Sequence, residues 1–102
     1  MPQIKLPRII ITQGAAQGLE RYRKFLAEKN PAAAIHAAQA ISQQLHLISH
    51  QPNSGRQLDS TPELSELIIP FGDSGYIALY RFDEETDVIY VLAFKHQKEA
   101  GY

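Results

Sequence analysis

Tyr76-Ile-Ala-Leu-Tyr-Arg-Phe82 and Val88-Ile-Tyr-Val-Leu-Ala-Phe-Lys95 are the two stretches that decide the fold of this chain. Both are rich in aromatic and β-branched residues, and only Asp83-Glu-Glu-Thr-Asp87 separates them. Two such runs joined by a short polar turn predict a β-hairpin. A polar tail, His96-Gln-Lys-Glu-Ala-Gly-Tyr102, follows the second run. We expect the upstream chain to cover one face of this hairpin. The tail is then expected to extend from the folded scaffold.

The first half of the chain predicts two helices. Apolar residues recur at three- and four-residue spacing over 15–26, which is typical of an amphipathic helix of about four turns, and Thr12 can cap it. Asn30 and Pro31 combine a good N-cap with a proline at the first helical position. A second apolar stripe runs from 31 to about 50. The linker between the helices is short enough to predict an antiparallel helical hairpin.

Two more strands complete the pattern. The β-branched run Ile4 to Thr12 predicts a first strand, whose start Pro7 confines to a sheet edge or a bulge because proline lacks an amide donor. A second strand is predicted from Glu63 to Ile69, and Pro70 is expected to close it. The order is β-α-α-β-β-β. This order predicts an α+β fold in which the helical hairpin packs on one face of a small, mostly antiparallel sheet of four strands.

The strand from Tyr76 to Phe82 has no purely polar side. Because side chains alternate along a strand, Ile77, Leu79 and Arg81 share one face. The face away from the helices is therefore expected to expose apolar area. Such a patch on a small protein commonly marks a partner surface.

Length and composition predict one domain over residues 1–102. Apolar residues make up 44% and charged residues 21%, which is ordinary for a soluble globular protein. No apolar run approaches the roughly 20 residues that cross a bilayer, and no secretory leader is evident. Cysteine is absent, which excludes disulfides and thiolate zinc sites. We expect a cytoplasmic protein with no membrane partner.

The net charge of −1 hides an asymmetry between the two halves of the chain. Residues 1–58 hold seven Lys and Arg against two acids, a net of +5, whereas residues 59–102 hold three against nine, a net of −6. We expect some of these charges to pair across the domain. Proteins that grip nucleic acid over a large surface usually have a net basic charge, so this balance disfavours that class.

Most catalytic signatures are missing. His46 and His50 are one helical turn apart, a spacing that can bind metal, but no acid or further histidine lies nearby in sequence. We interpret both as exposed helix residues and predict no metal and no cofactor. The sequence holds no glycine-rich phosphate loop and no serine elbow. The acidic run over 83–87 is most simply a solvated turn.

A more informative set combines cations with a histidine and a tyrosine: Arg56, Arg81, Lys95, His96, Lys98 and Tyr102. Cleavage of a phosphodiester by a 2′-hydroxyl needs a proton donor or acceptor, and positive charge near the developing phosphorane. Ordinary surface polar groups have the same composition. The residues alone favour this simpler interpretation.

Several segments resemble the RelE/ParE superfamily of type II toxin–antitoxin toxins, and the resemblance spans nearly the whole chain. The segments are Pro52-Asn-Ser-Gly-Arg56, the strand Leu64 to Ile69, Gly75-Tyr-Ile-Ala-Leu-Tyr-Arg81, and Val91-Leu-Ala-Phe-Lys-His-Gln-Lys-Glu-Ala-Gly-Tyr102. The resemblance implies the toxin of a plasmid-stabilisation module. It also implies a cognate antitoxin, ParD-like or RelB-like, in a hetero-oligomeric complex.

The superfamily divides by target. Its RelE-like branch consists of ribosome-dependent messenger-RNA endonucleases, whereas its ParE-like branch inhibits DNA gyrase without nuclease chemistry. The nuclease pattern has a basic residue just after the position matched by Tyr76, where this chain has Ile77. It also has lysines or arginines in the middle strands, and this chain has none between Gln57 and Tyr80. Tyr102 does match a tyrosine of the nuclease branch, and Arg56 is a candidate for its upstream cation.

These differences favour the ParE-like branch, in which the protein is a non-catalytic gyrase inhibitor. Its target-binding residues are then expected at Arg81, Lys95, His96, Lys98 and Tyr102. The alternative is a RelE-like endoribonuclease that acts on the ribosome, with Arg56, Arg81, His96 and Tyr102 as catalytic candidates. A third possibility is an inactive protein that binds only its antitoxin. The antitoxin is expected to dock an amphipathic helix or to add a strand at the edge containing Pro7.

Overall fold

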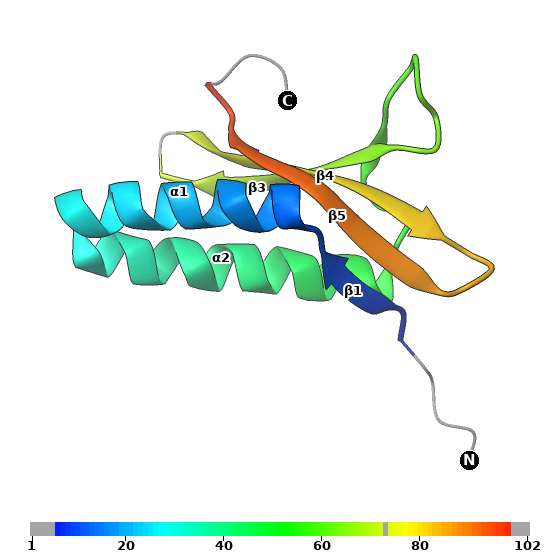
Figure 1. Ribbon diagram of the computed structural model, residues 1–102, viewed down its shortest axis with the longest axis horizontal. Coiled ribbons are helices and arrows are strands. Elements are labelled where there is room, and N and C mark those ends of the chain that lie inside the picture. Colours follow the sequence, from blue (N-terminus) through cyan, green and yellow to red (C-terminus); the bar gives the residue numbers. More distant parts are fainter. Residues whose placement is uncertain (1–5, 73, 99–102) are drawn as a thin grey trace.

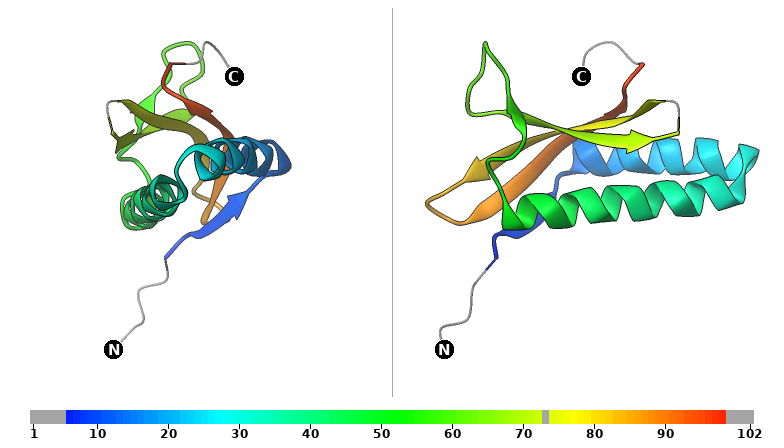
Figure 2. Two further views of the ribbon diagram at one scale, coloured as in Figure 1. Left: turned by 90° about the vertical axis from the view of Figure 1, so that its left-hand side faces the viewer. Right: turned by 180° about the vertical axis from the view of Figure 1, so that it is seen from behind.

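Two helices pack on one face of a five-stranded sheet in the computed structural model, which describes residues 6–72 and 74–98 (Figure 1). The elements are β1 (Arg8–Ile11), α1 (Gln13–Lys29), α2 (Pro31–His50), β2 (Arg56–Gln57), β3 (Ser65–Phe71), β4 (Ser74–Asp83) and β5 (Val88–His96). The strand order is β1-β5-β4-β3-β2, with β1 parallel to β5 and all other pairs antiparallel. The predicted α+β class and the position of the helical hairpin are confirmed. Figure 2 shows both helices on the same side of the sheet.

The sheet differs from the prediction in two details. It has five strands instead of four, because Arg56 and Gln57 pair with β3. A two-residue polar strand carries no alternation, so the sequence gives no signal for it. Pro70 was also predicted to close β3, and this is wrong, since β3 continues to Phe71. Pro70 lies beyond the reach of β2, where β3 is an edge strand and tolerates a proline.

The first strand confirms the expected role of Pro7. Pro7 directly precedes β1, and β1 is an edge strand of the sheet. The structure places β1 at Arg8–Ile11, and residues 4 and 5 of the predicted strand lie outside the described residues. The missing amide of Pro7 therefore costs no interior sheet hydrogen bond.

Both predicted helix caps are confirmed. The Thr12 hydroxyl accepts a hydrogen bond from the Ala15 amide at 3.4 Å, and it donates to the Val91 carbonyl at 2.8 Å. The Asn30 side chain accepts from the Ala33 amide at 3.2 Å. Asn30 alone links the two helices, which forces the antiparallel hairpin.

α1 lies close to β5 beside a β-bulge. The pairing of β4 with β5 shifts after Leu79, which pairs with Ala93, whereas Tyr80 pairs with Val91. Leu92 is the extra residue, as in a β-bulge. One turn into α1, a Cβ on Gly18 would lie 2.5 Å from the Phe94 carbonyl oxygen. Only glycine permits this approach of the helix to the strand.

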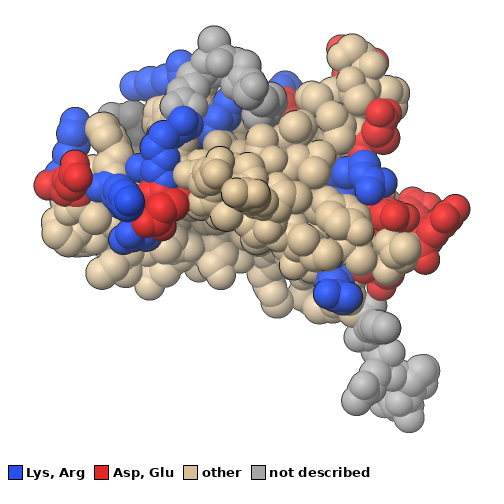
Figure 3. Space-filling model, in the orientation of Figure 1, with Lys and Arg blue, Asp and Glu red and all other residues tan. Residues whose placement is uncertain are grey.

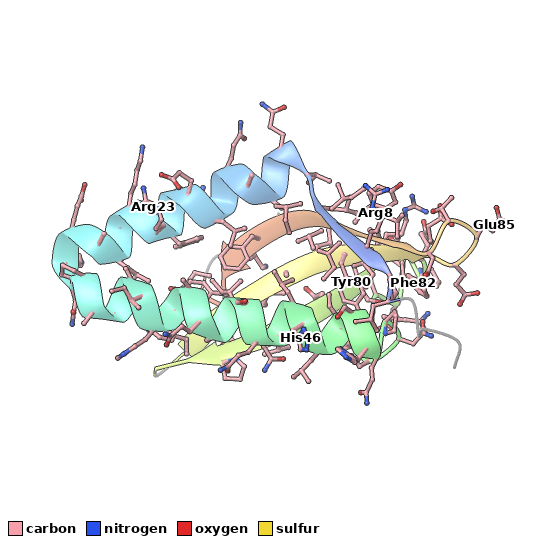
Figure 4. The ribbon with its side chains drawn as sticks, turned by 90° about the horizontal axis from the view of Figure 1, so that it is seen from below. Arg8, Arg23, His46, Tyr80, Phe82 and Glu85 are labelled. Carbon is pink, nitrogen blue, oxygen red and sulfur yellow. The ribbon has the colours of Figure 1, made fainter. Side chains whose placement is uncertain are left out.

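The core lies between the helices and the sheet. Its largest fully buried side chains are Tyr80, Ile48, Ile69, Ile89 and Val91. In Figure 4, which views the helix side, Tyr80 lies on the sheet side of α2. No described helix has the length and the hydropathy needed to span a bilayer.

Candidate functional site

We call the sheet surface away from α1 and α2 the open face. Strand pairing places the residues of this face in three rows that run across the strands. The first row holds Arg56, Glu66, Leu79 and Ala93, the second holds Ile68, Ile77 and Lys95, and the third holds Arg81 and Tyr90. Neither helix covers this surface (Figures 1 and 2). Ile68 lies at the centre of the open face, and its side chain is 40% exposed. Apolar area is therefore exposed on this face at Ile68, whereas Leu79, which was also predicted to face this side, is only 9% exposed.

Arg81 packs over an aromatic ring of the neighbouring strand. Its guanidinium carbon lies 5.1 Å from the centroid of the Tyr90 ring, the residue directly across on β5. A guanidinium over an aromatic face is stabilised by the ring quadrupole, and its edge stays available for hydrogen bonds. Arg81 is half-buried. It is thus a preoriented cation on the open face.

Arg56 is already engaged by an acid. Its guanidinium donates to the Glu66 carboxylate at 2.6 Å. The Arg56 side chain is 74% exposed, but that of Glu66 is only 8% exposed. The pair joins the basic half of the chain to the acidic half, as expected. An anion that bound Arg56 would have to compete with a largely buried carboxylate.

Lys95 and His96 are neighbours in sequence but lie on opposite faces of the sheet. Lys95 pairs with Ile77 on the open face. The His96 ring lies on the helix side, 6.0 Å from the ring of Tyr22 on α1 and 5.6 Å from that of Tyr76. The His96 Nδ1 accepts a hydrogen bond from the Lys98 amide at 3.1 Å. This bond favours the tautomer that carries its proton on Nε2.

The predicted site residues do not converge on one point. Arg81 and Ile77 are four residues apart on β4, so Arg81 and Lys95 lie about 13 Å apart along the strands. Of the nuclease candidates, Arg56 and Arg81 lie on the open face, His96 lies on the helix side, and Tyr102 lies outside the described residues. Lys98 is exposed beyond the end of β5.

A second surface lies on the helix side. A groove of about 400 Å³ runs between α1 and α2, and Tyr76 from β4 contributes to its lining. The other lining residues are Ala16, Leu19, Glu20, Tyr22, Arg23, Leu26, Ala34, Ala37, Ala38, Ile41, Ser42 and Leu45. Burial raises the pKa of the Tyr76 hydroxyl, which stays neutral. Apart from Glu20, Arg23 and Ser42, the lining residues are Ala, Leu, Ile and Tyr, so the groove is mostly apolar.

The rim of this groove carries an ion pair. The Arg23 guanidinium donates to both Glu20 carboxylate oxygens, at 2.6 and 2.9 Å. These hydrogen bonds lower the pKa of Glu20 below its usual range. The two side chains are 58% and 50% exposed, so the pair contributes little to stability. It does add charge beside an apolar surface.

Acidic side chains gather at one end of the molecule. Figure 3 shows them around the turn between β4 and β5, while Lys and Arg side chains lie over α1. The Asp83 carboxylate accepts from the Glu85 amide at 3.1 Å and from the Thr86 amide at 3.4 Å. Hydrogen bonding to Thr86, by side chain and by backbone, lowers the pKa of Asp83. The exposed residues Glu84, Glu85 and Thr86 confirm the solvated turn.

Sequence reasoning missed two contacts that shape these surfaces. The Tyr80 hydroxyl donates to the Pro52 carbonyl and accepts from the Gly55 amide, both at 2.9 Å. Gly14 and Gly18 face the backbone of β5, although the sequence shows them only as glycines near a helix start. Their spacing of four residues places both on one helix face, which is a detectable signal.

Comparison with known proteins adds the family. Residues 9–101 match the ParE toxin of type II toxin–antitoxin systems, parDE. The chain is also 29% identical over 73 residues to Toxin RelE1 of Caulobacter vibrioides, a match that covers 72% of this chain and 76% of that protein.

Two solved structures share the fold. The toxin–antitoxin complex RelBE2 of Mycobacterium tuberculosis has a TM-score of 0.65 at 19% identity, and the match covers 91% of this chain and 100% of the other. A mutant of E. coli toxin RelE in the free state has a TM-score of 0.60 at 14% identity, with coverage of 94% and 88%. At these identities the two structures support the fold alone. The match over residues 9–101 goes further, and the chain belongs to the ParE toxin family of type II toxin–antitoxin systems.

Proposed function

We propose that this toxin is ParE-like in its target: it binds DNA gyrase through the open face and inhibits it without catalysis of its own. The observation that carries the proposal is the separation of the candidate catalytic groups. Arg81 and His96 lie on opposite faces of the sheet, and Arg56 is paired with Glu66. General acid–base catalysis needs these groups within hydrogen-bonding reach of one scissile phosphate.

The chemistry of the open face supports a protein target. Its centre is apolar at Ile68 and Ile77, with single cations near its margins at Arg81 and Lys95. Protein–protein interfaces commonly combine an apolar centre with a polar rim and with arginine. An RNA surface would instead need several cations aligned along the backbone. The acidic turn at Asp83 would repel RNA from one end of the face.

A supercoiling assay tests the proposal. Purified gyrase converts relaxed plasmid into supercoiled plasmid with ATP, and stoichiometric toxin is expected to block this conversion. Arg81→Ala should weaken the block, because it removes the preoriented cation of the open face. Normal supercoiling at excess folded toxin would end the proposal.

The second candidate is RelE-like cleavage of messenger RNA on the ribosome. It is supported by the sequence relative Toxin RelE1, which is 29% identical over 73 residues. In this case His96 would transfer a proton, and arginines would hold the phosphate. Toeprinting on translating ribosomes would reveal new cleavage sites in the presence of toxin. His96→Ala should abolish those sites if His96 is catalytic.

We further propose that a cognate antitoxin neutralises the toxin by docking an acidic amphipathic helix in the α1–α2 groove. The groove is mostly apolar. α1 carries Arg21, Arg23, Lys24 and Lys29 against only Glu20 and Glu28. An amphipathic helix buries its apolar face in such grooves, and acidic flanks would pair with the α1 cations.

A groove variant separates neutralisation from toxicity. Ala38 lines the groove and is exposed, so Ala38→Arg should block helix docking without disturbing the core. We expect Ala38→Arg to arrest growth as the unmodified toxin does, but to resist rescue by co-expressed antitoxin. His36→Arg, on the same helix and outside the groove, is the control. Full rescue of Ala38→Arg would contradict this docking site.

A further inference from the structure

The last turns of α2 hold two imidazole rings side by side. His46 and His50 are both exposed, and their ring centroids lie 4.5 Å apart with an interplanar angle of 60°. Figure 4 places His46 on the C-terminal half of α2. The i, i+4 spacing of His46 and His50 permits their rings to contact each other but does not require it. The structure shows that the two rings are in contact.

A hydrogen bond fixes the ring of His50. Its Nδ1 lies 3.0 Å from the His46 carbonyl oxygen. A carbonyl oxygen only accepts, so Nδ1 must donate, and the lone pair of the neutral ring is then on Nε2. Histidines that ligate metals almost always donate their other ring nitrogen to a carbonyl or a carboxylate in this way. This bond leaves the Nε2 lone pair of the neutral His50 ring available to a ligand.

From this geometry we infer that His46 and His50 chelate a divalent first-row transition-metal ion, such as Zn²⁺, Ni²⁺ or Cu²⁺. A ligating nitrogen lies about 2.0–2.1 Å from zinc, which puts a ring centroid about 3.2 Å from the ion. Two such rings at about 90° to 109° have centroids about 4.5–5.2 Å apart. The observed 4.5 Å lies within this range.

The surroundings favour a cation. Both rings lie near the C-terminal end of α2, where the helix macrodipole is negative. α2 carries no Lys or Arg that would repel a metal ion. Among the residues that the structure describes, no third His, Asp or Glu joins the pair. Water completes the coordination, because both side chains are exposed.

The test is titration of the untagged toxin with ZnCl₂, NiCl₂ and CuCl₂ in an isothermal calorimeter. We expect one ion per chain, with Cu²⁺ bound most tightly. His46→Ala and His50→Ala should each weaken binding by at least about tenfold, the scale on which even outer-shell partners of a metal act. His36→Ala, an exposed histidine of the same helix, should leave the affinity unchanged.

Three results would overturn the inference. The unmodified protein could bind none of the ions, or His36→Ala could weaken binding as much as the other variants. A stoichiometry of one ion per two chains would show that the ion bridges two copies of the protein instead of binding within one chain. His46→Ala retains the carbonyl that orients His50, and both residues are exposed, so circular dichroism should report folded variants.

Discussion

The two faces of the sheet are made from the same strands, yet they differ in nearly every physical respect. On β3, Ile69 points into the core and is fully buried, whereas its neighbour Ile68 is 40% exposed. On β5, His96 packs among aromatic rings, whereas Lys95 lies on the open face. The covered face thus carries the stability of the fold. The open face keeps an apolar side chain in solvent at Ile68, which is consistent with the partner surface proposed above.

Truncation of the two neighbouring isoleucines gives the largest contrast. Ile69→Ala should lower the free energy of unfolding by about 2–5 kcal/mol, because it opens a cavity in the core. Ile68→Ala should change it by about 1 kcal/mol or less. Urea denaturation followed by circular dichroism measures both. Equal losses would contradict the assignment of the two faces.

Gly18→Ala tests the close approach of α1 to β5. A Cβ at Gly18 would lie 2.5 Å from the Phe94 carbonyl oxygen, which belongs to the backbone and cannot rotate away. Alanine gains about 1 kcal/mol of helix propensity over glycine, but the clash should outweigh it and leave a net loss of about 1–3 kcal/mol. Gln17→Ala, exposed on the same turn, should cause almost no loss. A stabilised Gly18→Ala variant would refute this packing.

Tyr80→Phe removes only a hydroxyl from the covered face. That hydroxyl bonds the Pro52 carbonyl and the Gly55 amide, and its loss leaves both without this partner. We expect a loss of about 1–2 kcal/mol in the free energy of unfolding. The open-face counterpart Tyr90→Phe should have a smaller effect. A neutral Tyr80→Phe would show that water replaces the hydroxyl at no cost.

The smallest effect concerns acid sensitivity at the turn between β4 and β5. The folded pKa of Asp83 is lowered from its ordinary value of 3.8. Its contribution to stability is therefore present above that value and is lost as the pH falls through the folded pKa. Asp83→Asn should remove this part of the acid dependence. Thermal melts of both proteins from neutral to acid pH measure it, and parallel curves would contradict the assignment.

Most of the fold could be predicted because its signals are local. The caps at Thr12 and Asn30, the apolar stripes of the helices and the β4–β5 hairpin all follow from short-range patterns. The strand at Arg56 has no local signal, since pairing with Glu66 creates it. The extension of β3 through Pro70 likewise depends on its position at a sheet edge. Long-range pairing decides both cases.

The site was harder to predict than the fold. Strand alternation correctly placed Ile77 and Arg81 on a common face. It also separates Lys95 from His96, although the sequence groups them as one basic cluster. The bonds of Tyr80 to Pro52 and Gly55 join segments about 25 residues apart, so no local pattern reveals them. Tyr102 stays a prediction, because it lies outside the described residues.

The most direct test of the open face as the working surface is a paired substitution. Ile68→Glu places a charge on the open face, and Ile35→Glu places the same charge on α2, where Ile35 is 60% exposed and outside the groove. Each variant is assayed for inhibition of gyrase supercoiling at matched folded concentration. We predict that Ile68→Glu abolishes inhibition and that Ile35→Glu retains it. Equal inhibition by both variants, or loss only in Ile35→Glu, would contradict the open face as the surface that binds the target.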